Sequence, residues 1–292
     1  MLKPAFSTVA CPEWTLRDVA HKAVDLGFEF VELRTFGDGS RRFGCDPALT
    51  GESKVLTEFR EAGVDVVCLA TGLRFDEVVW PPVVGYLLPG YESDVRQGKR
   101  AVDLALGIEC PCVRVFGFEY ADRESKVAAL KRIAGRLALV VDHADKSGVR
   151  IAVENGGSFA TAKALRELVD AVGHPLLGAS YSLAAGVAAG DKPTGALDLL
   201  SEKLFVARIK DLDATGRPVA LGKGKLQIEP FVKALVARSF DGPLVFEWDR
   251  AWMPELATPE GVLAEASRTI FGWIAGSSAA RPRGGASRPV AR

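Results

Sequence analysis

Eight short apolar runs recur along the chain, and longer amphipathic segments separate them. The runs cover residues 5–10, 28–34, 64–70, 112–117, 149–154, 176–182, 204–211 and 243–249. Segments between them, such as 14–27, 93–107, 124–148 and 228–239, place apolar residues three and four positions apart, as amphipathic helices do. This alternation is typical of repeated strand–helix units around a parallel sheet. Eight strands, each followed by a helix, within about 250 residues predict an α/β fold that is a single closed (β/α)8 barrel.

A doubly wound dinucleotide-binding sheet is the main alternative, but the chain lacks its glycine signature. No G-x-G-x-x-G follows the first apolar run. The glycine-rich residues 221–225 are too few for a phosphate-binding loop, so we interpret them as a turn. We assign residues 1–275 to the barrel and residues 276–292, which are rich in small residues and carry four arginines, to a disordered tail. A basic docking arm is the other interpretation of this tail.

Composition argues against several classes of partner and location. Thirty-seven Lys and Arg balance thirty-seven Asp and Glu, so no net field favours nucleic acid or an anionic membrane. Five cysteines without a C-x-x-C pair indicate reduced thiols and a cytoplasmic protein. No apolar run reaches the ~18 residues of a membrane span, and the first residues do not resemble a signal peptide. Residues 78–91 are apolar and proline-rich, which suggests a lid or a contact between subunits of a homo-oligomer.

Charged residues stand at alternate positions in five of the apolar runs. Because side chains on a strand alternate in direction, the apolar set should face the helices and the charged set the barrel axis. This rule sends Phe205, Ala207 and Ile209 outward and Ser180 and Ser182 inward. It also sends inward seven charged residues: Glu32, Arg34, Arg114, Glu154, Arg208, Lys210 and Glu247. Most stand at the carboxyl ends of the strands, where barrel enzymes place their chemistry. They are either a ligand pocket or a self-satisfied layer of ion pairs.

The order and spacing of several phrases resemble the xylose isomerase-like TIM barrels, the sugar phosphate isomerase/epimerase family. The resemblance covers about residues 6–273 and rests on "STVACPEWTLRDVAHKAVDLGFEFVELR", "GVRIAVENGG", "HPLLGASYS", "RIKDLDATGRPVALGKG" and "GPLVFEWDRAWMPEL". It implies one divalent metal, Mg²⁺ or Mn²⁺, at the carboxyl rim. Its ligands would be a Glu ending strand five, an Asp ending strand six, a His on strand seven and a Glu on strand eight.

Only the two glutamates of that implied ligand set are present, as Glu154 and Glu247. The strand-six Asp is replaced by Ser182, the His three residues later by Ala185, and the strand-seven His by Arg208. Where relatives read Trp-His-Pro-Glu after strand eight, this chain reads Trp-Met-Pro-Glu from Trp252 onward. The three histidines of the chain are predicted elsewhere: His21 and His143 on outer helices, and His174 at the opposite end of the barrel. The sequence therefore predicts no metal and no other cofactor.

The guanidinium of Arg208 is the expected substitute for the metal, because it is a permanent cation within reach of both glutamates. The predicted function is a sugar isomerase/epimerase-like enzyme, or a related lyase, acting on a small polyhydroxylated carbonyl compound. Glu154 and Glu247 would move protons, while Arg208 and Lys210 would stabilise the developing negative charge. The remaining predicted substrate-binding residues are Glu32, Arg34, Arg114, Asn155, Ser182, Asp211 and Trp252.

Four inward cations against three inward carboxylates favour an anionic substrate. The alternative is that Glu32 and Asp211 absorb the positive surplus. A catalytically inactive barrel that serves as a small-molecule binding protein or partner subunit is the second functional hypothesis. A metal held by Glu154, Glu247, Ser182 and water is disfavoured, because Arg208 would direct a cation at it.

Overall fold

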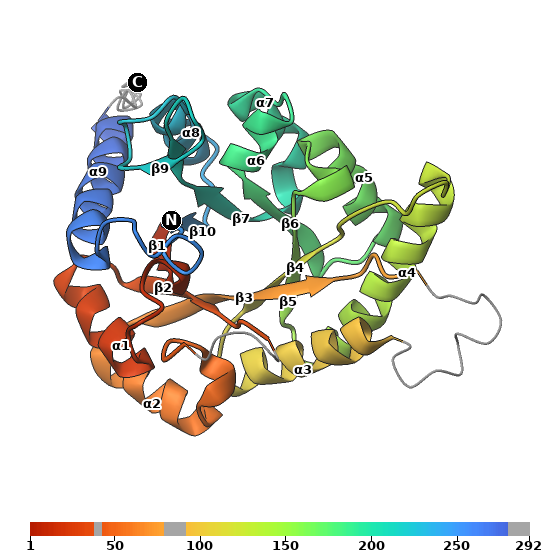
Figure 1. The fold of residues 1–292 in the computed structure, drawn as a ribbon, viewed down its shortest axis with the longest axis horizontal. Coiled ribbons are helices and arrows are strands. Elements are labelled where there is room, and N and C mark those ends of the chain that lie inside the picture. The colour runs from red at the N-terminus through yellow and green to blue at the C-terminus, as the bar shows by residue number, and fades with distance from the viewer. Residues whose placement is uncertain (38–42, 79–91, 280–292) are drawn as a thin grey trace, which may run out of the picture.

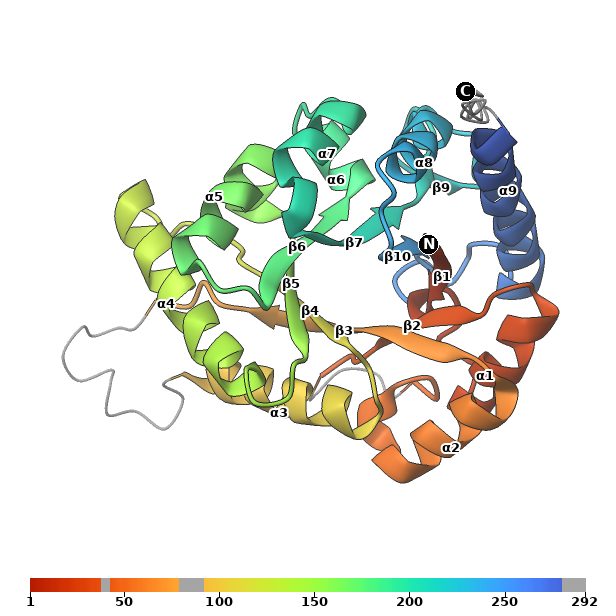
Figure 2. The same cartoon turned by 180° about the vertical axis from the view of Figure 1, so that it is seen from behind.

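The computed structural model describes residues 1–37, 43–78 and 92–279. Its main sheet is a closed parallel barrel with the order β1-β10-β7-β6-β5-β4-β3-β2. Figures 1 and 2 show these strands at the centre from opposite sides, with the helices around them. The barrel strands are β1 Lys3–Ser7, β2 Phe30–Arg34, β3 Asp65–Arg74, β4 Cys112–Phe116, β5 Arg150–Glu154, β6 Leu177–Ser182, β7 Leu204–Ile209 and β10 Pro243–Phe246. The predicted (β/α)8 barrel and all eight predicted strands are confirmed.

The helices form the outer layer of the barrel. They are α1 Leu16–Asp25, α2 Glu52–Ala62, α3 Ser93–Gly107, α4 Lys126–Ala144, α5 Ala162–Val172, α6 Leu183–Ala188, α7 Pro193–Leu200, α8 Ile228–Ala237 and α9 Pro259–Ala279. Short 3-10 helices lie at Thr8–Ala10, Pro47–Leu49, Gly157–Phe159 and Ser201–Lys203. Both views place α9 beside α8 and next to α1, so the last helix closes the ring on the first.

Local sequence signals set the ends of several helices. Thr15 and Asp18 form a capping box at the start of α1, because each side chain accepts a hydrogen bond from the other residue's backbone amide. Gly63 ends α2 and Gly173 ends α5, both in the left-handed conformation that a glycine adopts at little cost.

Two apolar cores stabilise the barrel. The larger one lies between the strands and the helices, as the outward-facing apolar residues predict. The smaller one fills the barrel interior and consists of Ala5, Val67, Cys68, Cys112, Ala152, Phe205, Val206 and Val245. Inward charged residues stand on the carboxyl side of this interior plug, for example Arg114 after Cys112 and Glu154 after Ala152. The plug therefore confines the polar chemistry to one end of the barrel.

One predicted side-chain direction is wrong. Phe205 packs in the interior core and lies beneath the guanidinium of Arg150, at 4.9 Å from its Cζ, instead of facing the helices. The strict alternation fails because the register between β6 and β7 shifts: Ala179 pairs with Leu204, but Ser180 pairs with Val206. Phe205 is the extra residue of this irregularity. The alternation resumes after it, so Arg208 still faces inward.

The carboxyl-terminal region also differs from the predicted boundary. Residues 276–279 continue α9 instead of beginning the tail, and residues 280–292 lie outside the described part of the chain. Residues 79–91, most of the predicted lid or subunit contact, are likewise not described.

A two-stranded hairpin that we did not predict, β8 Asp211–Leu212 and β9 Pro218–Val219, follows β7. All five cysteines are free and buried. Among the described residues, no helix has the length and apolar character that a membrane span requires.

Candidate active site at the carboxyl rim

Arg208 on β7 lies at the centre of the charged cluster. Its guanidinium pairs with both carboxylate oxygens of Glu32, and Nη2 donates to Oε1 of Glu247 at 2.6 Å. Its Nε lies 3.2 Å from Oε2 of Glu154, which makes a charge contact without hydrogen-bond alignment. The side chains of Arg208 and Glu32 are fully buried. One guanidinium thus holds three glutamates that come from β2, from the end of β5 and from the residue after β10.

The exposed part of the cluster lines a cavity of about 490 Å³ above Arg208. Its walls comprise Val9, Arg34, Arg114, Phe116, Glu154, Ser182, Ala184, Ala185, Lys210, Leu212, Glu247, Asp249 and Trp252. Glu154 and Glu247 therefore face the cavity, whereas Arg208 and Glu32 lie beneath it. We predicted that Arg208 and Glu32 would touch the substrate. The structure places them as the charged floor that holds the cavity carboxylates.

The two cavity glutamates differ in their affinity for a proton. Burial raises the pKa of Glu154, although the charges of Arg208 and Arg114 oppose this rise. Burial would also raise the pKa of Glu247, but the charges of Arg208 and Lys210 outweigh it and lower this pKa to about 2. For Glu32, burial is likewise outweighed by the charge and hydrogen bonds of Arg208, so its pKa is lowered. Of the two cavity glutamates, Glu154 therefore holds a proton more readily than Glu247.

Lys210 has a partner that the sequence analysis missed. Its Nζ donates to Oδ2 of Asp249 at 2.8 Å and to Oδ1 at 3.2 Å. Burial would lower the pKa of Lys210, but the charges of Glu247 and Asp249 outweigh burial and raise it. Asp249 stands two residues after Glu247, so the alternation that identified Glu247 could also have identified it.

Asp249 changes the charge balance of the cluster. With it, the four cations Arg34, Arg114, Arg208 and Lys210 meet four carboxylates: Glu32, Glu154, Glu247 and Asp249. The predicted excess of one positive charge is therefore wrong for the cluster as a whole. Asp211, which we considered as an absorber of that surplus, has a different role.

Two predicted substrate-binding residues are engaged with the backbone and do not line the cavity. Asn155 accepts a hydrogen bond from the amide of Ser182 at 2.6 Å and donates to the carbonyls of Ala160 and Ser182. It therefore fastens the end of β5 to the end of β6. Asp211 accepts hydrogen bonds from the amides of Gly222 and Gly224, both at 2.9 Å, and organises the loop after β7. The sequence could not show that these polar groups are satisfied within the fold.

Four other predicted binding residues do line the cavity. Arg34 and Arg114 form one side, Ser182 lies at the end of β6, and Trp252 is a half-exposed ring at the mouth. The carbonyl oxygen of Thr71 on β3, which the sequence analysis did not single out, accepts hydrogen bonds from the guanidinium groups of both Arg34 and Arg114. No sequence signal reveals a backbone acceptor of this kind.

The residues at the rim do not fit the divalent metal that the family resemblance implies. The guanidinium of Arg208 lies against both remaining ligand-type glutamates, Glu154 and Glu247. Ser182 offers one hydroxyl, and Ala185 offers no donor, at the positions of the missing aspartate and histidine. In the described parts of the chain, no three His, Cys, Asp or Glu side chains are grouped as metal ligands. A buried cation between the two carboxylates would also repel a metal ion.

The three histidines lie away from this rim. His21 is exposed on α1, and His143 on α4 contacts Asp103 at 2.7 Å. His174 lies before β6, where its Nδ1 accepts a hydrogen bond from the amide of Leu176. These placements agree with the predicted ones.

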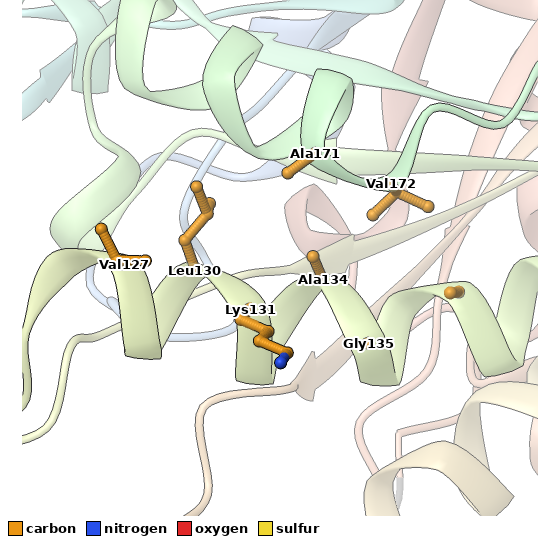
Figure 3. A pocket seen from close by; sticks show the side chains of 8 residues that line it. Val127, Leu130, Lys131, Ala134, Gly135, Ala171 and Val172 are labelled. Atoms are coloured by element: carbon orange, nitrogen blue, oxygen red, sulfur yellow. The ribbon is translucent and has the colours of Figure 1, made fainter.

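A second hollow, of about 440 Å³, lies on the outside of the barrel between α4 and α5 (Figure 3). It is lined mainly by apolar side chains, among them Val127, Leu130, Ala134, Ala171 and Val172. Among the described residues that line this hollow, Lys131 alone is charged. Because no pair of acid and base groups lies there, we place the candidate active site at the carboxyl rim.

Comparisons with known proteins agree with this architecture. The chain resembles a solved structure of L-ribulose 3-epimerase with a TM-score of 0.78 and 15% identity, covering 96% of both chains. A zinc-bound structure of IolI protein has a TM-score of 0.77 and 17% identity, with 94% of this chain and 99% of that chain covered. The probable 3-DHS dehydratase AsbF from Bacillus anthracis gives 0.72 and 15%, with 92% and 98% covered.

At these identities the structural likeness shows the fold alone. No curated protein sequence matches the chain. The sequence model of one family, described as xylose isomerase-like TIM barrel, matches residues 20–270. That span includes seven of the eight barrel strands and every charged residue of the rim cluster. The chain therefore belongs to the xylose isomerase-like TIM barrel family.

Proposed function

We propose that this protein is a sugar isomerase/epimerase-like enzyme, or a related lyase, that moves a proton at a carbon next to a carbonyl group without a resident divalent metal. The substrate class is a small polyhydroxylated carbonyl compound with an anionic group. The observation that carries the proposal is the unequal pair of cavity glutamates, Glu154 with a raised pKa and Glu247 with a pKa of about 2. Unequal carboxyl groups in one pocket are a recurring arrangement for acid–base catalysis.

Glu154 is the proton-transferring group in this proposal. Its carboxylate takes the proton from the carbon next to the carbonyl, and the carbon's electron pair moves onto the carbonyl oxygen. Lys210, which lines the same cavity, offers a cationic donor to that oxygen. The hydroxyl group on the deprotonated carbon then passes its proton to the former carbonyl oxygen and becomes the new carbonyl, while Glu154 returns its proton to the former carbonyl carbon, which completes an isomerisation. Return of the proton to a leaving hydroxyl group gives an elimination instead.

The low pKa of Glu247 favours chemistry with one base over two-base epimerisation. The sequence alone predicts that both Glu154 and Glu247 move protons. A group with a pKa of about 2 holds almost no proton near neutral pH and returns one poorly. We therefore assign Glu247 the role of a fixed anion that holds Arg208 and Lys210 in place.

The second candidate is a barrel that binds a small molecule without chemistry, alone or as a partner subunit. One observation favours it: Arg208, the proposed substitute for the metal, is fully buried and occupied by three carboxylates. The predicted cytoplasmic location and the predicted homo-oligomer remain predictions.

Deuterium exchange separates the two candidates without knowledge of the product. The protein is incubated in heavy water with aldonates, keto sugar acids and ketose phosphates, and incorporation at carbon is followed by NMR. We expect exchange into at least one compound, and a loss of roughly 100-fold or more in Glu154→Gln. Glu255→Gln is the matched control, because Glu255 is an exposed residue paired only with Arg217 among its described contacts.

Two results would overturn the enzymatic proposal. One is binding of several of these compounds with no exchange in any of them, which supports the binding protein. The other is exchange that Glu154→Gln leaves intact, which removes Glu154 from the chemistry.

A further inference from the structure

Two guanidinium groups lie side by side on one wall of the cavity. Arg34 ends β2 and Arg114 lies on β4, on either side of β3. Both donate to the carbonyl oxygen of Thr71 on β3, Arg114 at 2.7 Å. Their exposed fractions are 9% and 4%. Two buried like charges that share one neutral acceptor repel each other, so each of them favours a negatively charged partner.

Arg34 and Arg114 differ in their acidic partners. Nε of Arg114 lies 3.0 Å from Oε2 of Glu154. Within residues 1–37, 43–78 and 92–279, no carboxylate lies at ion-pair distance from Arg34, and its buried Nε has no hydrogen-bond partner. Burial, followed by the charge of Arg114, lowers the pKa of Arg34 to about 9. The charges of the cluster sum to zero, but they are unevenly distributed: three carboxylates gather around Arg208, and Arg34 is the cation without a carboxylate beside it among the described residues.

The surroundings of Arg34 fix its guanidinium facing the cavity. The rings of Phe36 and Trp252 lie 5.9 and 6.0 Å from its Cζ, and Trp252 lines the same cavity. Gly72 leaves room on the other side, since a Cβ there would lie 3.2 Å from Nη2 of Arg34. The planar fork is thus held by ring contacts and by the Thr71 carbonyl before any ligand arrives.

We infer that Arg34 and Arg114 form a subsite for an anionic oxygen group, carboxylate or phosphate, with Arg34 as the residue that selects for it. The fork of donors on a guanidinium matches the paired oxygens of both groups. This inference rests on the proposed function only in treating the ligand as the substrate. An anion bound at Arg34 and Arg114 places the rest of a small molecule toward Glu154, because Arg114 belongs to the subsite and also contacts the carboxylate of Glu154.

Binding measurements on the full chain test the subsite independently of any turnover. Isothermal titration and thermal shift are recorded with inorganic phosphate, with the phosphate ester of fructose against fructose, and with gluconate against glucose. We expect the anions to bind and their neutral counterparts to bind at least roughly tenfold more weakly. The phosphate and gluconate arms distinguish the two sources of anionic oxygen.

Three variants locate the effect. Arg34→Met should weaken anion binding roughly 10- to 100-fold. Arg34→Lys keeps the charge but lacks the paired donors of a guanidinium, so its affinity for the anions should lie between that of Arg34→Met and that of the unaltered protein. Arg217→Met is the control, because Arg217 is half-exposed and pairs with Glu255 away from the cavity. Melting temperatures measured without ligand verify that each variant is folded.

Either of two results overturns the inference: none of the anions binds better than its neutral counterpart, or Arg34→Met and Arg34→Lys both retain the parent's affinity. Anion binding that depends on Arg34, without deuterium exchange in any compound, supports the subsite and overturns the proposed enzymatic function instead.

Discussion

Arg208 is fully buried and holds three carboxylates with one positive charge. Glu32 takes two of its donors, Glu247 a third, and Glu154 lies against its Nε. A planar guanidinium suits this role because its five donors point in fixed directions and its charge is permanent. Removal of such a cation leaves buried charges without compensation, which costs far more than the loss of a surface ion pair.

Arg208→Met should therefore lower the free energy of unfolding by roughly 3 to 5 kcal/mol near neutral pH. Without the cation, the glutamate pKa values in the folded protein should rise above the ordinary value of 4.5. The variant then gains stability as the pH falls, because its folded state binds protons more tightly than its unfolded state. Chemical denaturation at about pH 8 and about pH 5 should show a smaller deficit at the lower pH.

The matched control is Arg132→Met, which removes a partly exposed arginine paired with Glu124 outside the barrel interior. Its loss should be smaller. Arg208→Met combined with Glu32→Gln should recover part of the stability, because one buried charge fewer is left unpaired. An Arg208→Met deficit no larger than that of Arg132→Met, and equal at both pH values, would contradict the buried network.

The segment that follows β7 depends on one carboxylate and two glycines. Asp211 accepts hydrogen bonds from the amides of Gly222, Gly224 and Leu226, so it fixes the loop that carries the β8–β9 hairpin. A Cβ at Gly224 would lie 2.1 Å from Oδ1 of Asp211 and 2.5 Å from the carbonyl oxygen of Leu212. Since Leu212 lines the cavity, the geometry of this loop reaches the candidate site.

We expect Gly224→Ala to destabilise the protein by roughly 1 to 3 kcal/mol, because its methyl group overlaps the carboxylate and backbone that hold the loop. Gly135→Ala on α4 is the control, since nothing lies within 4 Å of the added methyl group there. A helix-interior alanine should be neutral or stabilising by roughly 0.5 to 1 kcal/mol. Equal melting temperatures for the two variants would refute this account of the loop.

The strands were predictable from sequence because each one is a short apolar run bounded by turns and helices. Their order follows from the regular βα repeat, which leaves a closed barrel as the simplest arrangement of eight parallel strands. The inward position of Phe205 was not predictable in this way, because it depends on a register shift between β6 and β7. Such a shift is decided by packing between strands and leaves no mark in the alternation of either one.

The side chains that face the barrel axis were also predictable, but not their depth or their partners. Glu32 and Glu154 both follow the alternation, yet Glu32 lies beneath the cavity and Glu154 lines it. Asn155 and Asp211 were candidates for ligand contacts, whereas backbone amides and carbonyls occupy their side chains. Depth and hydrogen-bond satisfaction arise only when neighbouring strands and loops are brought together.

At the scale of the whole molecule, the carboxyl rim of this barrel carries a cluster of four cations and four carboxylates where the family resemblance implies a metal site. The apolar interior plug and the helix layer remain those of an ordinary barrel. Ser182 and Arg208 stand at this carboxyl rim at the positions of two implied ligands, and Ala185 stands where the resemblance implies a histidine. We propose that the guanidinium of Arg208 substitutes at this rim for a divalent ion.

A Mn²⁺ titration followed by electron paramagnetic resonance tests that claim most directly. When Mn²⁺ is added to the dialysed protein, the spectrum should remain that of the free ion, because Arg208 occupies the carboxylates of Glu154 and Glu247. A triple variant with Ser182→Asp, Ala185→His and Arg208→His restores the two implied ligands and the implied neighbouring histidine, and it should bind about one ion per chain. The contradicting result is about one Mn²⁺ bound per chain by the unaltered protein and lost in Glu154→Gln and Glu247→Gln.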